Sequence, residues 1–132
     1  MAVTNGDRVK SVLDALNAPI RAWAGPRLER VFGQPWLEAA VAREPLPEIG
    51  SDSDTWVVLH ALGRDWRDVV GSELTAEDRR CVDGLAEIGR EIASGTQTVS
   101  SDRCERALSD GERIARSLGE VELAAQLADT RA

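Results

Sequence analysis

Apolar residues recur along almost the whole chain at the three- and four-residue spacing of amphipathic helices. The first stripe predicts one long helix over residues 7–32, or two pieces hinged at Pro19 or Pro26, and Gly33 is expected to end it. Its apolar positions are Val9, Leu13, Leu16, Ile20, Trp23, Leu28 and Val31.

A short helix is predicted next, from Pro35 to about Ala42, because proline suits the first position of a helix. Residues 44–53 are rich in helix-breaking residues and form the longest predicted loop. The following helix is expected from Asp54 to about Gly71, with Ser53 as its cap. Its apolar face comprises Leu59, Leu62, Trp66, Val69 and Val70.

The second half predicts two more amphipathic helices and a short last one. Thr75 and Asp78 form an acidic capping box before the stripe Val82, Leu85, Ile88 and Ile92. Ser101 is expected to cap a helix with Cys104, Ala107, Leu108, Gly111, Ile114, Ala115 and Leu118 on one face. Gly119 closes that helix, and the last runs from Glu120 to about Asp129. No segment alternates with the period of a strand, so the pattern predicts an all-α, up-and-down bundle of four to five main helices.

Length and composition fit one globular domain. The 132 residues are enough for a single core, which we expect to span about residues 7–129. Apolar residues make up 42% and charged residues 30%, which excludes wholesale disorder. No apolar run approaches the roughly 20 residues that span a bilayer, and no signal-peptide pattern is present. We therefore expect a cytoplasmic protein that does not enter membranes.

The net charge of −7 opposes undirected binding of nucleic acid, which needs basic surface. The charge is uneven, because residues 1–33 carry five basic and three acidic side chains, whereas residues 34–132 carry eleven and twenty. This pattern is typical of a solvated surface of mixed sign. The alternative is a basic N-terminal helix that docks an acidic partner or RNA.

Residues for metal or cofactor chemistry are scarce. Cys81 and Cys104 lie on apolar stripes without a C-x-x-C spacing, so we expect two buried core thiols and no metal site. Phosphate-binding, dinucleotide-binding, serine-hydrolase and zinc-protease motifs are all missing, and no cofactor is implied.

The last third of the chain carries a family resemblance. Residues 89–95, then 99–102, then the amphipathic run 103–119 resemble the end of a HEPN domain, in the subgroup related to a yeast transcript-surveillance endoribonuclease. In that subgroup a helix ends in R-N-x-x-x-H before a capped helix. Here Arg90 stands in the Arg place, Glu91 in the Asn place and Gly95 in the His place. Residues 28–36 and 66–70 are similar to earlier parts of the subgroup, so the likeness covers roughly residues 7–127.

The resemblance implies a site near a dimer seam, where Arg steadies the scissile phosphate and His transfers protons around the 2′-hydroxyl without a metal. Glycine cannot transfer a proton, and Glu91 is expected to repel the phosphate beside Arg90. We therefore expect the RNase centre to be inactive. His60, the only histidine, could supply a proton from a neighbouring helix, although a packed or half-exposed structural role is the simpler interpretation. Trp36 and Trp56 flank the long loop and are candidate interface anchors.

Three hypotheses follow. The first is a non-catalytic HEPN-like module that dimerises or docks a partner, as the N-terminal piece of a larger protein in a bacterial phage-defence or nucleic-acid-conflict system. The second is a metal-independent endoribonuclease or RNA-binding domain that uses Arg90 with Glu91 or His60. The third is a generic helical adaptor whose resemblance to the family is accidental.

Overall fold

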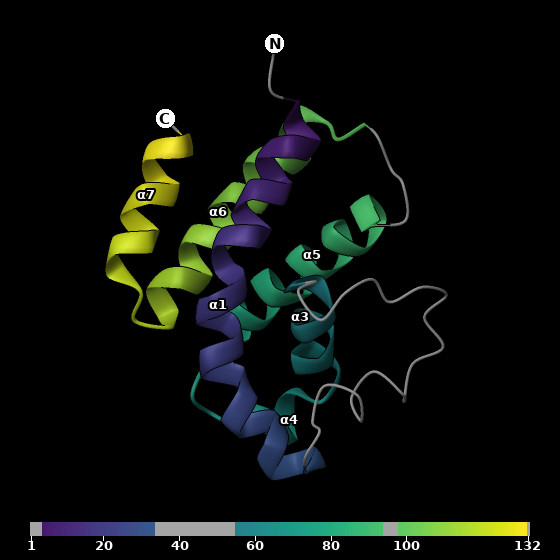
Figure 1. Ribbon diagram of the computed structural model, residues 1–132, viewed down its shortest axis with the longest axis vertical. Coiled ribbons are helices and arrows are strands. Elements are labelled where there is room, and N and C mark those ends of the chain that lie inside the picture. Colours follow the sequence, from purple (N-terminus) through teal and green to yellow (C-terminus); the bar gives the residue numbers. More distant parts are fainter. Residues whose placement is uncertain (1–3, 34–54, 94–97, 132) are drawn as a thin grey trace.

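The computed structural model describes residues 4–33, 55–93 and 98–131, and within them the chain forms six helices and no strand. These are α1 (Asn5–Phe32), α3 (Thr55–Arg64), α4 (Trp66–Val69), α5 (Ala76–Ala93), α6 (Ser101–Ser117) and α7 (Val121–Arg131) (Figure 1). The predicted all-α class is confirmed. The predicted helix over residues 35–42, the loop over 44–53 and the cap at Ser53 lie outside the described residues.

The long first helix is continuous. It passes through Pro19 and Pro26 without a break in the helical assignment, so neither proline divides it into two pieces. Thr4 caps its start by accepting a hydrogen bond from the Asp7 N–H at 3.0 Å, and the Asp7 side chain accepts from the Thr4 N–H in return. Gly33 ends the helix as predicted, with a φ of 79° that favours glycine.

The prediction of a single helix over residues 54–71 is wrong. The chain leaves helical geometry at Asp65, which has φ −109° and ψ 36°, and this residue separates α3 from α4. The break allows α4 to lie against α1, with Trp66 and Val69 buried. Just beyond it, the guanidinium of Arg27 pairs with Glu73 at 2.7 Å, which ties this corner to α1.

The predicted caps of the next two helices are close to those observed. Thr75 and Asp78 form the expected reciprocal box, with N–H to side-chain oxygen distances of 2.9 and 3.1 Å. The cap of α6 is Ser100 and not Ser101, since the Ser100 hydroxyl accepts from the Arg103 N–H at 3.2 Å. Two adjacent serines offer the same capping chemistry, so the pattern alone could not choose between them.

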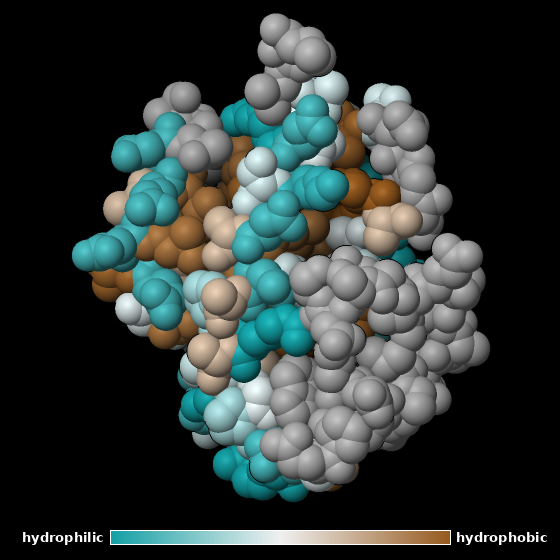
Figure 2. Space-filling view, in the orientation of Figure 1, coloured by the Kyte–Doolittle hydropathy of each residue, from teal (hydrophilic) through white to brown (hydrophobic). Residues whose placement is uncertain are grey.

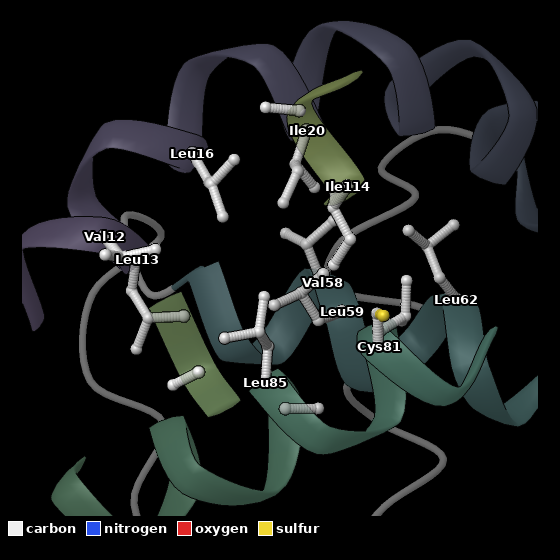
Figure 3. Close-up of a cluster of buried hydrophobic side chains, with 14 of the residues drawn as sticks. Val12, Leu13, Leu16, Ile20, Val58, Leu59, Leu62, Cys81, Leu85 and Ile114 are labelled. Carbon is white, nitrogen blue, oxygen red and sulfur yellow. The ribbon is translucent and has the colours of Figure 1, made fainter. Parts of the chain in front are cut away.

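The core lies where α1, α3, α5 and α6 pack around one another, each against the next, while α7 packs on α6 (Figure 1). Apolar side chains from all four helices meet there, among them Leu16, Val58, Leu85 and Ile114 (Figure 3). Cys81 and Cys104 are both buried and unbonded to each other, as predicted. Most of the predicted apolar stripes therefore face one shared core.

On the outside of the domain, polar ridges on α1 and α7 flank a band of apolar surface between them (Figure 2).

Helices α1 and α6 approach each other closely at Gly111. A Cβ atom placed there would lie 2.5 Å from Cγ1 of Val12, which is itself buried. Such a distance is far inside van der Waals contact, so any larger residue at this position would force Val12 or the helices to shift.

We expect Gly111→Ala to destabilise the fold by about 1 kcal/mol. Overpacking costs about 1–3 kcal/mol, and the higher helix propensity of alanine returns up to about 1 kcal/mol. Urea unfolding followed by circular dichroism measures the change. Ser109→Ala, at an exposed position of the same helix, is the control and should stay within about 0.5 kcal/mol of the parent. Equal stability of the two variants would contradict the close approach.

A buried carboxylate joins the start of α5 to the end of α6. Asp78 is only 4% exposed, and besides the Thr75 box its Oδ1 accepts from Arg113 at 3.1 Å and from the Ser117 hydroxyl at 2.7 Å. Burial alone would raise the pKa of Asp78, but the hydrogen bonds from Thr75, Ser117 and Arg113 outweigh it and lower the pKa. The ionised carboxylate is therefore the form that the folded domain stabilises.

This lowered pKa makes a prediction for acid stability. Asp78 should contribute its full stabilisation above its unfolded pKa of about 4 and lose it as pH falls through the lower folded value. Asp78→Asn should therefore cost roughly 1–3 kcal/mol at pH 7 and clearly less at pH 3, as measured by urea unfolding at both pH values. A loss that is equal at both pH values would contradict a role for the charge.

Candidate functional site

A cavity of about 370 Å³ lies between α3 and α5 and brings together two of the residues singled out in the sequence. His60 lines it from α3, and Arg90 lines it from α5. The remaining lining residues are Gly63, Arg64, Asp83, Ala86 and Glu87. The two helices pack closely enough for this because Gly89 faces α3, where a Cβ atom would lie 2.6 Å from the Cβ of Trp56.

Positively and negatively charged side chains both line the cavity. Arg64 and Arg90 can donate to an anion, and His60 can join them when protonated. Two carboxylates, Asp83 and Glu87, line the same space and offset those charges. Arg64 also bonds Asp65, with Nε 3.1 Å from Oδ2. This mixture of charges offers no broad basic surface to a nucleic-acid backbone.

Glu91 belongs to the opposite flank of α5. Both of its carboxylate oxygens accept from the guanidinium of Arg103 on α6, and the Nη1 to Oε1 distance is 3.3 Å. The hydrogen bond from Arg103 lowers the pKa of Glu91. The charge of Glu91 is thus balanced within the domain, which reduces the repulsion of phosphate beside Arg90 that the sequence predicted. Gly95, the third position of the motif, lies outside the described residues.

Of the two tryptophans proposed as interface anchors, the one that the structure describes is buried. Trp56 is 6% exposed, so its ring belongs to the interior of the domain and offers little surface to a partner. Trp36 lies outside the described residues. Their role at an interface stays a prediction, and the position of Trp56 does not favour it.

The sequence analysis missed a buried acid on α6. Asp110 is 3% exposed, and its Oδ1 accepts from the Cys81 thiol at 3.3 Å and from Arg80 Nη2 at 3.2 Å. Burial raises the pKa of Asp110, although Cys81 and Arg80 act in the opposite direction. The sequence did indicate that this acid is buried, because position 110 falls three residues after Ala107 on the apolar stripe. A charged residue on a buried stripe requires partners from another helix.

Neither a metal centre nor a membrane span is found in the described parts of the chain. Across residues 4–33, 55–93 and 98–131, no three His, Cys, Asp or Glu side chains are grouped so that they could hold a metal ion. In the same ranges, no helix combines the length and the apolar character needed to cross a bilayer.

The comparison with family models agrees with the resemblance. Residues 11–119 match the model described as Swt1-like HEPN. Because this match covers most of the 132 residues, the chain belongs to the HEPN superfamily, in its Swt1-like group. Comparison with curated proteins gave no match, and comparison with solved structures gave none either. Family membership excludes an accidental resemblance and makes the domain an RNase-like or RNA-related module.

The two thiols should be unreactive in the folded domain. Burial and the neighbouring Asp110 raise the pKa of Cys81 to about 12, and burial raises the pKa of Cys104. Since the thiolate is the nucleophile, iodoacetamide at pH 8 should leave both thiols unmodified in the native protein and label both in urea, as counted by mass spectrometry. Rapid native labelling of Cys81 would contradict the buried thiol–carboxylate pair.

Proposed function

We propose that this domain is a HEPN module that has lost RNase activity and acts by dimerising or by docking a partner protein. The observation that supports this most directly is the state of the motif positions. Only Arg90 keeps the side chain of the RNase motif, while Glu91 is engaged by Arg103 and glycine occupies the place of the histidine. Without a proton-transferring group in that place, the family's reaction loses a contribution of about 10²–10⁴ in rate.

The surface between α1 and α7 offers a place for such docking. Apolar side chains are exposed there between two polar ridges (Figure 2). Among the large apolar side chains in the described residues, Val121 at the start of α7 is the most open, with 71% of its surface exposed. Apolar surface of this kind is the common core of protein interfaces. We further propose that the module serves a bacterial phage-defence or nucleic-acid-conflict system, as the family resemblance implies.

A second function is favoured by one specific observation. His60 and Arg90 line the same cavity, so a histidine and an arginine could act on one phosphate even though the motif histidine is absent. In this alternative the domain is a metal-independent endoribonuclease, with His60 exchanging protons and Arg90 holding the phosphate. The carboxylates of Asp83 and Glu87 in the same cavity count against it, because they weaken its hold on an anion.

Light scattering and an RNA assay separate the two functions. The purified chain is measured over a range of concentrations and then incubated with a mixed RNA pool in EDTA. We expect self-association, or capture of a defined partner from the same operon, together with intact RNA. The variant Glu91→Asn with Gly95→His restores the motif and is the positive control for the assay.

The same measurements can contradict the proposal. Cleavage of RNA by the unmodified chain that disappears in His60→Ala and in Arg90→Ala would establish the second function. Arg67→Gln removes an exposed arginine of α4 outside the cavity and should leave any cleavage unchanged. A chain that neither self-associates nor captures a partner would rule out the docking module.

A further inference from the structure

A groove follows the seam between α5 and α6, on the flank of α5 that carries Glu91. It consists of two adjoining cavities of about 580 and 200 Å³ that share Arg106 and Asp110. The smaller one lies over Gly84 and Ile88 of α5 and Ala107 of α6, and the other residues that line the pair are Arg80, Glu87, Arg103, Glu105 and Ser109. Positive and negative side chains are equal in number here, so the groove suits a ligand without net charge.

Asp110 offers one oxygen to this groove. Its Oδ1 is used by Cys81 and Arg80, whereas Oδ2 accepts no hydrogen bond from any of the described residues. Asp110 lines both cavities although the residue is 97% buried, its relative exposure being 3%. A carboxylate oxygen in this position is a strong acceptor that still lacks a donor.

Two neighbours define the approach to that oxygen. Gly84 leaves it accessible, because a Cβ atom at this position would lie only 3.1 Å from Oδ2. Arg106 lines both cavities, acts electrostatically on Asp110, and forms no ion pair or hydrogen bond with the described residues. An open acceptor and an open donor therefore stand beside each other over an apolar floor.

We propose that this groove binds a planar nitrogen heterocycle of the nucleobase class. Its edge would donate an N–H to Asp110 Oδ2 and accept from the guanidinium of Arg106, while its face lies on Gly84, Ile88 and Ala107. Adjacent donors and acceptors on one edge are the feature by which side chains distinguish bases. A simple cation satisfies Asp110 but leaves three arginines facing it, and a simple anion satisfies Arg106 but meets the open carboxylate.

This site is separate from the His60–Arg90 cavity and does not depend on RNA cleavage. The His60–Arg90 cavity and the smaller cavity of the groove both adjoin α5, and Glu87 lines each of them. A strand of RNA that crosses α5 could thus place a phosphate on one side and a base on the other. The groove would then supply base preference to a domain of the RNA-related class, whether or not the domain cuts.

The test uses neutral nucleosides, so that phosphate binding elsewhere cannot produce the signal. Adenosine, cytidine, guanosine and uridine are titrated into the ¹⁵N-labelled chain, and amide shifts are followed by NMR. We expect at least one nucleoside to shift residues 84–88 and 106–110 in a saturable way. Inorganic phosphate is titrated in parallel and should leave these residues unshifted.

Three variants assign the contacts. Gly84→Ala covers Oδ2 without changing charge, Arg106→Gln removes the donor, and Asp110→Asn replaces the carboxylate by an amide of the same size. Each should weaken nucleoside binding about tenfold or more, since a good base-edge contact has about this effect on discrimination. Arg67→Gln removes an exposed arginine outside the groove and should bind as the parent does.

The outcomes decide the proposal. The site is disproved if no nucleoside shifts the groove amides, or if Gly84→Ala and Arg106→Gln bind as tightly as the parent. Because Asp110 also supports the core, circular dichroism accompanies each variant, and the other two variants suffice if Asp110→Asn does not fold. Nucleoside binding by a chain that neither self-associates nor captures a partner would support the groove while contradicting the docking function, so the two proposals fail independently.

Discussion

The close contact of α6 with α1 is the constraint on which the rest of the domain depends. At Gly111 the two helices meet with no room for a methyl group, and the start of α6 is held to α1 by a hydrogen bond from Asn5 Nδ2 to the Val99 carbonyl at 3.0 Å. With α6 fixed on α1, α5 and α3 complete the ring, and α7 has a surface on which to pack. Each helix alone is amphipathic and only marginally stable, so burial in the ring is what maintains it.

Much of this fold could be predicted from local patterns. The stripes of α1, α5 and α6 and the caps at Thr75 and Gly119 depend on spacing and side-chain chemistry within a few residues, and these predictions are confirmed within a residue or two. The break at Asp65 could not be seen in this way. Trp66 and Val69 continue the helical spacing of the residues before them, and only the packing of α4 on α1 requires the chain to turn there.

The candidate site shows the same division between local and tertiary information. The motif comparison pointed to Arg90 and Glu91 as neighbours in one centre, yet successive residues of a helix point in different directions. In the folded domain Arg90 lines the α3–α5 cavity with His60, while Glu91 pairs with Arg103 of α6. The role of Asp110 was equally hidden, since its partners Arg80 and Cys81 lie about thirty positions earlier and meet it only through the packing of α5 on α6.

The position of Glu87 has a thermodynamic consequence. This side chain lines the cavity toward α3 and the groove toward α6, so one flexible carboxylate borders two separate spaces. A ligand that draws Glu87 toward itself, or drives it away, changes the charge that the other space presents. Any such effect must be reciprocal, because the free energy that couples two sites is the same whichever is filled first. Helix α5 can therefore connect occupancy on its two flanks through a change of rotamer, without moving its backbone.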